Sequence, residues 1–251
     1  MALLDGKVAI VTGAGQGVGR GIALALAKEG AAVAVIGRTL EKCERTLAEI
    51  EEAGGRGIAL SCKVNHRDQV EAAVAEVIGQ LGGVDILVNN AHTSNPMVPF
   101  EQVSDKDLAI ALHGYYGAVY FMQACFEQLK ARKGKVFNLG SSAGIRGDAG
   151  FTAYAGGKEA IRAISRVAAR EWGVHGITVN VICPFSDSPG IDYMIEAQPG
   201  YIDELTSETM LKRLGSSELD VGRTVAFLAS EGGSYITGQT INVDGGIVIA
   251  P

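Results

Sequence analysis

A short apolar strand, a glycine-rich turn and an apolar helix follow one another at the beginning of the sequence, and this order restricts the fold more than any other feature. Residues 7–12 read Lys-Val-Ala-Ile-Val-Thr, a β-branched run typical of a buried parallel strand. The turn is Gly13-Ala-Gly-Gln-Gly-Val-Gly19, and an alanine-rich helix is predicted from about Gly17 to Lys28. Glycines let the backbone approach a ligand closely, and the first N–H groups of a helix attract phosphate. This segment therefore predicts a site for a dinucleotide pyrophosphate.

The alternation of strands and helices continues to the end of the chain. Further strands are predicted at about 31–36, 57–64, 85–89, 135–139, 177–182 and 240–243. Helices are predicted at about 40–53, 67–80, 105–132 and 219–230, and another carries residues 154–158 and runs to about residue 172. Strict alternation without a linker predicts a single α/β domain over residues 1–251, a doubly wound Rossmann domain with a parallel sheet of about seven strands flanked by helices.

Composition and charge exclude several other classes of protein. Hydrophobic residues make up 47% of the chain, which is enough for a sizeable core and too much for a disordered protein. A net charge of -6 favours no nucleic acid partner, and no apolar run reaches the ~18 residues that a membrane helix needs. The four cysteines are scattered without a CxxC pair, so we expect buried reduced thiols, no metal site and a cytoplasmic protein.

Tyr154 and Lys158 lie four residues apart on a predicted helix, about one turn from each other on the same face. A free phenol has a pKa of ~10, and a nearby ammonium favours the phenolate and lowers that pKa. The tyrosine could then exchange a proton with an alcohol oxygen, and the hydroxyl of Ser141 on a neighbouring strand could bind the same oxygen. The same spacing also occurs by chance on solvated helix faces, so the surrounding motifs decide between the two interpretations.

Several further motifs make the sequence resemble a short-chain dehydrogenase/reductase over essentially its full length. They are Thr12-Gly13-x-x-x-Gly17-x-Gly19, Asn89-Asn90-Ala91, Ser141 with Tyr154-x-x-x-Lys158, Gly176-Ile-Thr-Val-Asn180, and Ile236-Thr-Gly238-Gln with Val243-Asp244-Gly-Gly246. The pattern is most similar to members of about 250 residues that resemble 3-oxoacyl reductases. The resemblance implies an oxidoreductase that passes a hydride between a nicotinamide cofactor and a carbonyl or secondary alcohol.

The resemblance also implies roles for individual residues. Tyr154 is expected to be the general acid/base, Ser141 to orient and polarise the substrate oxygen, and Lys158 to bind the nicotinamide ribose and lower the pKa of the tyrosine. The positions implied for the cofactor are Thr12, Gly13, Gln16, Gly17, Val18, Gly19, Arg38, Thr39, Lys63, Val64, Asn90, Ala91, Tyr154, Lys158, Pro184 and Ser188.

The choice between NADP(H) and NAD(H) depends on the residue that follows the second predicted strand. About 20 residues after the glycine turn, an acidic side chain would bind the ribose 2′-hydroxyl of NAD. This sequence has Gly37 and Arg38 there, and a guanidinium suits a 2′-phosphate. Lys63 replaces an aspartate that usually meets the adenine, and it adds positive charge nearby. We therefore expect NADP(H), with NAD(H) as the alternative if Arg38 only begins a surface helix.

Two positions depart from the family pattern near the reacting groups. Gly114 stands where an asparagine usually holds a water in a proton relay with the lysine. Either water fills this gap, or the relay is rewired through His113, or the rate is much reduced. His92 replaces the glycine of Asn-Asn-Ala-Gly, and it either contacts substrate, acts as a pH-sensitive group, or is a turn histidine that merely faces the cleft.

Residues 185–213 interrupt the alternation with prolines and glycines, as expected of a hinged substrate lid. Phe185 replaces the usual glycine after Pro184, and Ser188 or Ser186 is expected to take over a contact with the cofactor carboxamide. The expected substrate contacts are His92, Phe185 and Tyr193. The apolar part of the lid predicts a hydrophobic carbonyl or alcohol as the substrate.

Two expectations concern the protein as a whole. The resemblance implies a homotetramer or homodimer, and the apolar face around Tyr116 and Tyr120 would serve either this contact or the core. Gly114 leaves an alternative to catalysis, in which the chain is a nucleotide-binding sensor or a weakly active protein of the same fold.

Overall fold

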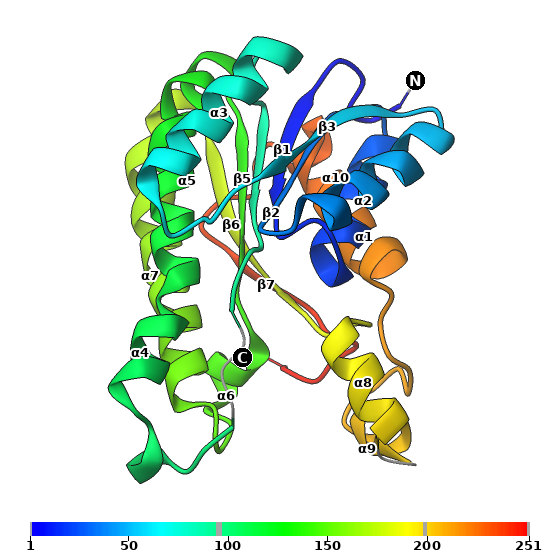
Figure 1. Ribbon diagram of the computed structural model, residues 1–251, viewed down its shortest axis with the longest axis vertical. Coiled ribbons are helices and arrows are strands. Elements are labelled where there is room, and N and C mark those ends of the chain that lie inside the picture. The colour runs from blue at the N-terminus through cyan, green and yellow to red at the C-terminus, as the bar shows by residue number, and fades with distance from the viewer. Residues whose placement is uncertain (1, 94–96, 198–199, 250–251) are drawn as a thin grey trace.

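The computed structural model describes residues 2–93, 97–197 and 200–249. Seven strands form one parallel sheet in the order β3-β2-β1-β4-β5-β6-β7 (Figure 1). The strands are β1 Val8–Thr12, β2 Ala32–Gly37, β3 Arg56–Ser61, β4 Ile86–Asn89, β5 Lys135–Leu139, β6 Thr178–Pro184 and β7 Thr240–Val243. The prediction of an α/β fold with a parallel sheet of about seven strands is confirmed.

Helices cover both faces of the sheet (Figure 1). One layer consists of α1 (Gly17–Lys28), α2 (Leu40–Glu52) and α10 (Arg223–Ala229), and the other of α3 (Arg67–Leu81), α5 (His113–Arg132) and α7 (Thr152–Trp172). Successive side chains of a strand point to opposite faces. In β1, Ala9 and Val11 therefore pack into the first layer, and Val8 and Ile10 pack into the second. All of β1 is buried, which explains its continuous apolar sequence.

The single helix expected at 105–132 is divided at Leu112 into α4 (Asp105–Ala111) and α5. Gly114 in the first turn of α5 is buried, and a Cβ there would stand 3.3 Å from the carbonyl oxygen of Ala91. The backbone of α5 thus approaches the loop after β4 closely, whereas α4 begins with a capping box of its own, formed by Ser104 and Asp107. The expectation of a continuous helix was wrong, because apolar spacing does not record a break of one residue.

The segment expected to be a substrate lid contains two short helices, α8 (Pro189–Ala197) and α9 (Tyr201–Ser207). They stand together beyond the carboxyl end of β6 (Figure 1). A π-helical turn, Ser217–Gly222, returns the chain from this segment to α10. On the opposite side of the sheet edge, the short α6 (Ser142–Arg146) connects β5 to α7. The carboxyl edge of the sheet therefore lies between α6 and the α8–α9 segment.

The strand order fixes where a ligand can enter. The chain crosses from β1 to β2 and β3 on one side, and then returns to place β4 on the other side of β1. The loops after β1 and β4 therefore leave in opposite directions, and ligands of open α/β sheets bind in the crevice that this reversal creates at the carboxyl ends. Thr12 and Asn89 end these two strands, so the crevice begins at these residues.

The described part of the chain has neither a membrane-spanning helix nor a cluster of metal-ligating side chains. Within residues 2–93, 97–197 and 200–249, no helix is long and apolar enough to span a bilayer. The same residues contain no cluster of three or more His, Cys, Asp or Glu side chains that could hold a metal ion. Cys43, Cys62, Cys125 and Cys183 are buried and free. Burial raises the pKa of Cys43 and Cys62 to about 11, so these thiols stay protonated at neutral pH.

Candidate active site

The glycine turn after β1 is shaped by the side chain of Asn90. The amide nitrogen of Asn90 donates to the carbonyl oxygen of Thr12 at 2.9 Å and to that of Gly13 at 3.2 Å. Gly13 has a φ of 66°, and a Cβ there would stand 2.8 Å from the same amide nitrogen. A Cβ at Gly19 would also overlap this nitrogen. Both positions exclude any side chain, so the turn keeps a bare backbone of the kind that a pyrophosphate needs.

Thr12 joins the turn to the loop after β4. Its hydroxyl oxygen accepts hydrogen bonds from the backbone N–H groups of Asn90 and Ala91, at 3.0 and 3.1 Å, and donates to the carbonyl of Val88 at 3.3 Å. The structure thus brings together Thr12, Gly13, Gly17, Gly19, Asn90 and Ala91 of the expected cofactor positions. Val18 follows Gly17 in the first turn of α1 and packs against the core. These residues fit the dinucleotide that the sequence predicts.

Tyr154, Lys158 and Ser141 meet at the carboxyl end of β5. Ser141 caps α6, where its hydroxyl oxygen accepts the backbone N–H of Ala143 at 3.2 Å. A hydrogen bond joins the side chains of Ser141 and Tyr154. Lys158 is buried one turn further along α7, with its ammonium nitrogen 5.7 Å from the centre of the Tyr154 ring. The three residues therefore form one polar cluster, although 17 positions separate the first from the last.

The pKa of Tyr154 differs in direction from the expected one. Burial raises this pKa above its ordinary value of 10.0, and the hydrogen bond with Ser141 lowers it only in part. The ammonium of Lys158 donates to the carbonyl oxygen of Leu139 at 2.9 Å, and burial lowers its own pKa to about 8. The expected lowering by Lys158 is thus absent in the free protein, where Tyr154 carries its proton.

A buried row of polar side chains anchors α7 to the sheet. The amide of Asn89 donates to the amide oxygen of Asn138 at 2.8 Å, and the Asn138 amide nitrogen donates to the hydroxyl of Ser165 at 2.8 Å. Ser165 donates in turn to the carbonyl of Ile161 within α7. Asn138 and Ser165 were not expected at the site. Asn138 is fully buried within the apolar strand Lys135–Leu139, and an asparagine in such a strand indicates that a polar partner lies nearby.

The two expected cations of the adenosine end lie at neighbouring strand ends. Gly37 of β2 pairs in register with Ser61 of β3, and Arg38 and Lys63 follow shortly after them. Both side chains are exposed, as is Thr39 at the start of α2. Val64 instead packs against Gly117 of α5, where a Cβ would stand 2.8 Å from it, so Val64 forms part of the wall.

A third cation approaches the turn from α2. The ammonium of Lys42 donates a hydrogen bond to the side-chain oxygen of Gln16. Sequence reasoning missed Lys42, although it falls one helical turn after Arg38. Both Gln16 and Lys42 line a cavity of about 480 Å³ between the glycine turn, α2 and the base of the α8–α9 segment.

The α8–α9 segment begins against the glycine turn. Ser188 accepts the backbone N–H of Ile191 at 3.3 Å, and a Cβ at Gly17 would stand 3.2 Å from the ring of Pro189. Ser186, the alternative to Ser188, is buried and hydrogen-bonds Ser217 at 3.1 Å. Ser188 therefore lies beside the glycine turn, whereas the hydroxyl of Ser186 is used in a buried hydrogen bond within the fold.

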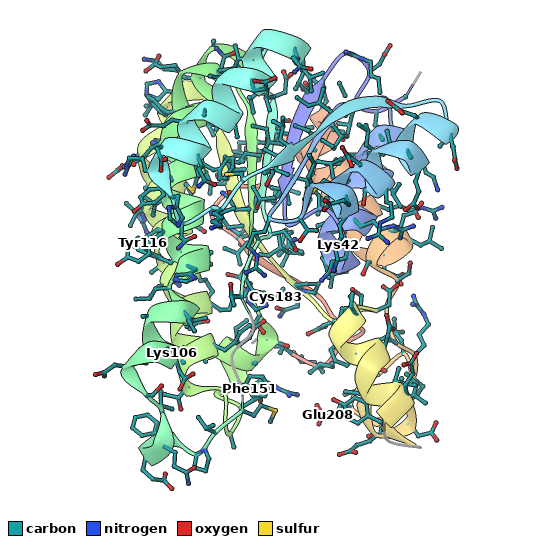
Figure 2. All side chains as sticks on the ribbon, in the orientation of Figure 1. Lys42, Lys106, Tyr116, Phe151, Cys183 and Glu208 are labelled. Carbon is teal, nitrogen blue, oxygen red and sulfur yellow. The ribbon has the colours of Figure 1, made fainter. Side chains whose placement is uncertain are left out.

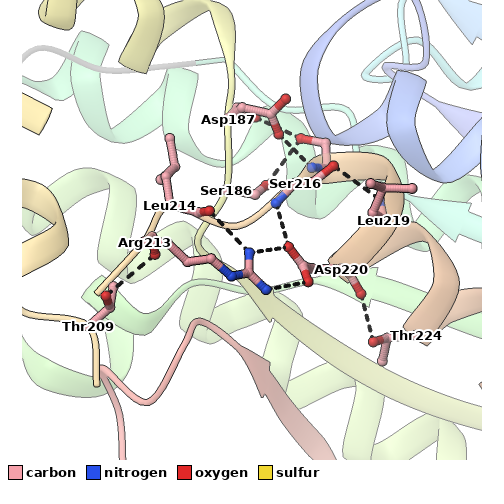
Figure 3. A network of polar contacts seen from close by, with 10 residues as sticks. Ser186, Asp187, Thr209, Arg213, Leu214, Ser216, Leu219, Asp220 and Thr224 are labelled. Carbon is pink, nitrogen blue, oxygen red and sulfur yellow. Dashed lines mark hydrogen bonds and ion pairs between the residues drawn. The ribbon is translucent and has the colours of Figure 1, made fainter. Parts of the chain in front are cut away.

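A network of polar contacts holds the end of this segment (Figure 3). The guanidinium of Arg213 donates to both carboxylate oxygens of Asp220, at 2.7 and 2.8 Å. Asp220 also accepts the backbone N–H of Ser216 at 2.7 Å, and these bonds lower its pKa to about 2. Residues 186–187 and 213–220 are thereby fixed, so any movement of the segment is confined to the residues between them.

The expected substrate contacts fall in three different situations. The ring of His92 meets that of Tyr154 edge-on, with 5.2 Å between the ring centres. Phe185 is half-buried directly after Pro184, at the end of β6, and its backbone N–H donates to the carbonyl of Val243 at 3.0 Å. The side chain of Tyr193 lies outside the described part of the structure. Phe151 completes the surroundings of Tyr154, 5.8 Å away between ring centres (Figure 2).

Comparisons with known proteins agree with this geometry. The family described as enoyl-(acyl carrier protein) reductase matches residues 13–248. A 12alpha-hydroxysteroid dehydrogenase of Clostridium sp. is 36% identical and covers 98% of each chain. The 3-oxoacyl-(acyl-carrier-protein) reductase FabG of Staphylococcus aureus is 37% identical over 96% of this chain and 98% of its own.

Solved structures give the same result. A hydroxysteroid dehydrogenase from Escherichia coli superposes with a TM-score of 0.85 at 30% identity, over 97% of each chain. A Sinorhizobium meliloti protein assigned as a short-chain alcohol dehydrogenase reaches a TM-score of 0.90 at 33% identity, also over 97% of each chain. The sequence motifs, the parallel sheet and these relatives agree over nearly the whole length. The chain belongs to the short-chain dehydrogenase/reductase family, whose members bind a nicotinamide dinucleotide, and it is an oxidoreductase that acts on alcohol or carbonyl groups.

Proposed function

We propose that the protein is an NADP(H)-dependent oxidoreductase that interconverts a carbonyl and a secondary alcohol, with Tyr154 as the general acid/base. The observation that carries this proposal is the hydrogen bond between Ser141 and Tyr154 beside a buried lysine, at the carboxyl edge of the sheet. Reduction of a carbonyl requires a proton donor, and a second hydroxyl can hydrogen-bond the same carbonyl oxygen. No structural role of these three side chains explains why a lysine is buried there.

The residues of the glycine turn would hold the dinucleotide at its phosphates. Gly13, Gly17 and Gly19 supply the bare backbone, and Asn90 keeps it in shape. The bound nicotinamide supplies or accepts a hydride at its C4 position. Lys158 is placed to donate to ribose hydroxyls once it exchanges the carbonyl of Leu139 for them. Ser188 and Pro184, at the base of the α8–α9 segment, are the proposed contacts at the nicotinamide end.

In the reductive direction, Ser141 and Tyr154 first bind the carbonyl oxygen of the substrate. Their hydrogen bonds draw electron density toward this oxygen and make the carbonyl carbon a better hydride acceptor. As the hydride bonds to that carbon, the electron pair of the C=O bond moves to the oxygen, and Tyr154 transfers its phenolic proton there. The products are the alcohol and the phenolate of Tyr154. Lys158 stabilises this phenolate by its positive charge, and oxidation of an alcohol follows the same steps in reverse.

Positive charge at the adenosine end supports NADP(H) over NAD(H). Arg38 and Lys63 are exposed at neighbouring strand ends, and Lys42 of α2 is hydrogen-bonded to Gln16 of the glycine turn. A 2′-phosphate would gain charge-assisted hydrogen bonds from such groups, whereas the 2′-hydroxyl of NAD would gain little. The preference is therefore proposed to reside chiefly in Arg38, which directly follows β2.

The proposed substrate is a hydrophobic ketone or secondary alcohol. Phe151 and Phe185 supply apolar surface near Tyr154 and at the end of β6. The described side chains of the α8–α9 segment include the carboxylates Asp192, Glu196, Asp203 and Glu204, which disfavour polyanionic substrates. Two relatives are hydroxysteroid dehydrogenases by name, and a large apolar alcohol of that kind is within the proposed class. Gly114 and His92 motivate the alternative of a nucleotide-binding sensor, and the assembled cluster of Ser141, Tyr154 and Lys158 weighs against it. A cytoplasmic homotetramer or homodimer remains part of the proposal.

The test combines cofactor binding with turnover. Fluorescence titration of the purified protein should give tighter binding of NADPH than of NADH, and Arg38→Ala should weaken NADPH binding about tenfold while leaving NADH unchanged. Arg56→Ala, an exposed arginine at the amino end of β3, is the matched control. Turnover of a panel of hydrophobic ketones should disappear in Tyr154→Phe and persist in Tyr235→Phe, whose ring is fully exposed. Turnover by Tyr154→Phe at the rate of the native protein would refute the proposed mechanism.

A further inference from the structure

His92 occupies a position from which it can reach a bound substrate. It lies on the loop after β4, and its ring meets the edge of the Tyr154 ring at an interplanar angle of 63°, with 5.2 Å between centres. The side chain is exposed to solvent, although protein atoms lie close around it. A substrate whose oxygen binds Tyr154 would therefore extend past the imidazole. The imidazole of His92 thus lies beside the ring whose hydroxyl is the proposed proton donor.

The beginning of α5 makes room for this imidazole. Gly114 is buried against the loop, and a Cβ there would stand 3.5 Å from the Cβ of His92 and 3.7 Å from the side chain of Ile161. A larger side chain at position 114 would compete with His92 for the same space. Gly114 thus brings the backbone of α5 close to the base of the His92 side chain.

The protonation state of His92 determines what it can recognise. Burial among protein atoms and the charge of Lys158 lower its pKa to about 4, so the imidazole is neutral at physiological pH. A hydrogen bond to the backbone of Thr93 acts in the opposite direction and favours the protonated ring, as expected when a ring N–H donates to a carbonyl. A neutral imidazole has one N–H and one acceptor nitrogen. With the N–H used by Thr93, the nitrogen left for the cleft is the acceptor.

We propose that His92 determines substrate specificity by accepting a hydrogen bond from a hydroxyl group on the carbon next to the reacting carbon. The preferred substrates are then α-hydroxyketones and vicinal diols within the apolar class. This inference rests on the proposed carbonyl–alcohol activity at Tyr154, and it adds a second point of recognition beside it. Because an acceptor buried by a substrate without a donor is left unpaired, the site discriminates against simple ketones.

The test uses two pairs of small substrates that differ by one hydroxyl. Cyclohexanone is compared with 2-hydroxycyclohexanone, and cyclohexanol with 1,2-cyclohexanediol, in both ring configurations of the diol. The native enzyme should favour the hydroxylated member by roughly tenfold or more in kcat/KM. His92→Phe keeps an aromatic ring against Tyr154 but has no acceptor, so the ratio of the two kcat/KM values within each pair should fall toward one. His92→Asn should retain part of the preference, and His66→Phe, an exposed histidine at the start of α3, should leave it unchanged.

Equal kcat/KM values for both members of each pair in the native enzyme would overturn the proposal. An equal loss on both members in His92→Phe would overturn it as well, because His92 would then only support the shape of the loop.

A spectroscopic measurement separates this question from turnover. Long-range ¹H–¹⁵N spectra of the Tyr154→Phe protein with NADP⁺ report the tautomer of His92, which is assigned by comparison with His92→Phe. We expect one protonated nitrogen and one acceptor nitrogen, and we expect 2-hydroxycyclohexanone to shift the acceptor signal whereas cyclohexanone leaves it in place. Identical spectra with both compounds would refute the role of His92, whatever the activity of the native protein. Loss of turnover alone, with the expected shift present, would count against the proposed function and not against His92.

Discussion

Lys158 and Leu139 are joined by a hydrogen bond of 2.9 Å from the ammonium nitrogen to the backbone carbonyl, at the point where β5 ends. The lysine side chain is only 6% exposed, and the carbonyl is the one acceptor for it among the described residues. A single neutral acceptor does not replace the hydration of an ammonium. The free protein therefore holds a charge that destabilises its fold, in the place where a ribose and a phenolate would need it.

Removal of this ammonium should stabilise the free protein. The pKa of Lys158 is lowered from 10.5 to about 8, so between these two values the unfolded chain binds more protons than the folded one. Stability should therefore rise as the pH increases from 8 to 10.5, and the full penalty, on the order of 3 kcal/mol, applies below pH 8. Lys158→Met should be more stable by about 2 kcal/mol at pH 7, after the loss of the hydrogen bond is included.

Urea denaturation at several pH values measures this effect, with the exposed Lys106→Met as the control. A Lys158→Met protein that is less stable than the native one at pH 7 would contradict the account. The variant should also have lost turnover, which would show that the buried charge is kept for function at the expense of stability.

The two directions of the reaction should depend on pH in opposite ways. In the proposed mechanism, reduction requires the protonated phenol of Tyr154, and oxidation requires the phenolate. Because burial raises the pKa of Tyr154 in the free protein, the rate of reduction should stay constant across neutral pH, and the rate of oxidation should rise with pH. Initial rates between pH 6 and about 10.5 test both slopes.

Absorbance of the phenolate gives an independent measurement without substrate. The difference between the native protein and Tyr154→Phe should show ionisation of this tyrosine only above its ordinary pKa of about 10. Ionisation near neutral pH in the free protein would mean that Lys158 does lower the pKa directly. Tyr235→Phe, which removes an exposed phenol, is the control for the loss of a tyrosine outside the site.

Asn138 should act on catalysis through the position of α7. Asn138→Ala leaves the amide of Asn89 and the hydroxyl of Ser165 without their shared partner, which should cost about 1–3 kcal/mol of stability. The helix that carries Tyr154 would be less firmly held, so kcat should fall severalfold while the KM for cofactor changes little. Ser165→Ala should be less than additive with Asn138→Ala, because both remove the same contact. Additive changes in stability, or a normal kcat in a destabilised protein, would limit Asn138 to a structural role. The control is Ser234→Ala, which changes an exposed serine.

Arg146 and Glu208 form an ion pair between α6 and the end of the α8–α9 segment. The guanidinium of Arg146 lies 2.7 Å from the carboxylate of Glu208 and also binds Asp148 through two nitrogens, at 2.9 and 3.0 Å. Both partners are partly exposed, so a double-mutant cycle should give a coupling below about 1 kcal/mol. Glu208→Gln should raise the substrate KM about twofold to threefold at low salt, and the effect should vanish at ~1 M salt.

The matched control for this pair is Glu204→Gln, an exposed carboxylate on α9. An equal rise of KM in both variants would assign the effect to the total charge of the segment. A rise that persists at high salt would point to a contact with substrate in place of the ion pair.

Several features followed directly from patterns in the sequence. The alternation of apolar strands and amphipathic helices predicts a parallel sheet, because each crossover must return the chain to the same edge. Gly13, Gly17 and Gly19 predict the turn after β1, since only glycine permits the observed φ of 66° at Gly13 and the close approach at Gly19. The spacing of Tyr154 and Lys158 predicts that they share one face of a helix. All of these depend on neighbours within about one element of the chain.

Other features depend on contacts between elements that are distant in sequence. The break at Leu112 arises where α5 meets the loop after β4, and the direction of the Tyr154 pKa follows from burial and from the carbonyl that Lys158 reaches. A spacing of four residues predicts that a lysine lies beside a tyrosine, but it does not predict which backbone carbonyl accepts a hydrogen bond from the ammonium. Asn138 was overlooked for the same reason, since its partners lie on β4 and α7.

The sequence by itself thus determined the architecture and the family, and it predicted Ser141, Tyr154 and Lys158 as the reacting groups, because periodicity and motif spacing are local properties of the chain. Only the tertiary structure decided the direction of the Tyr154 pKa shift, the anchoring of α7 and the contact of His92 with Tyr154. Each of these depends on distance, burial and hydrogen-bond partners across the carboxyl edge of the sheet. Those quantities exist only once the strands have brought the distant residues together.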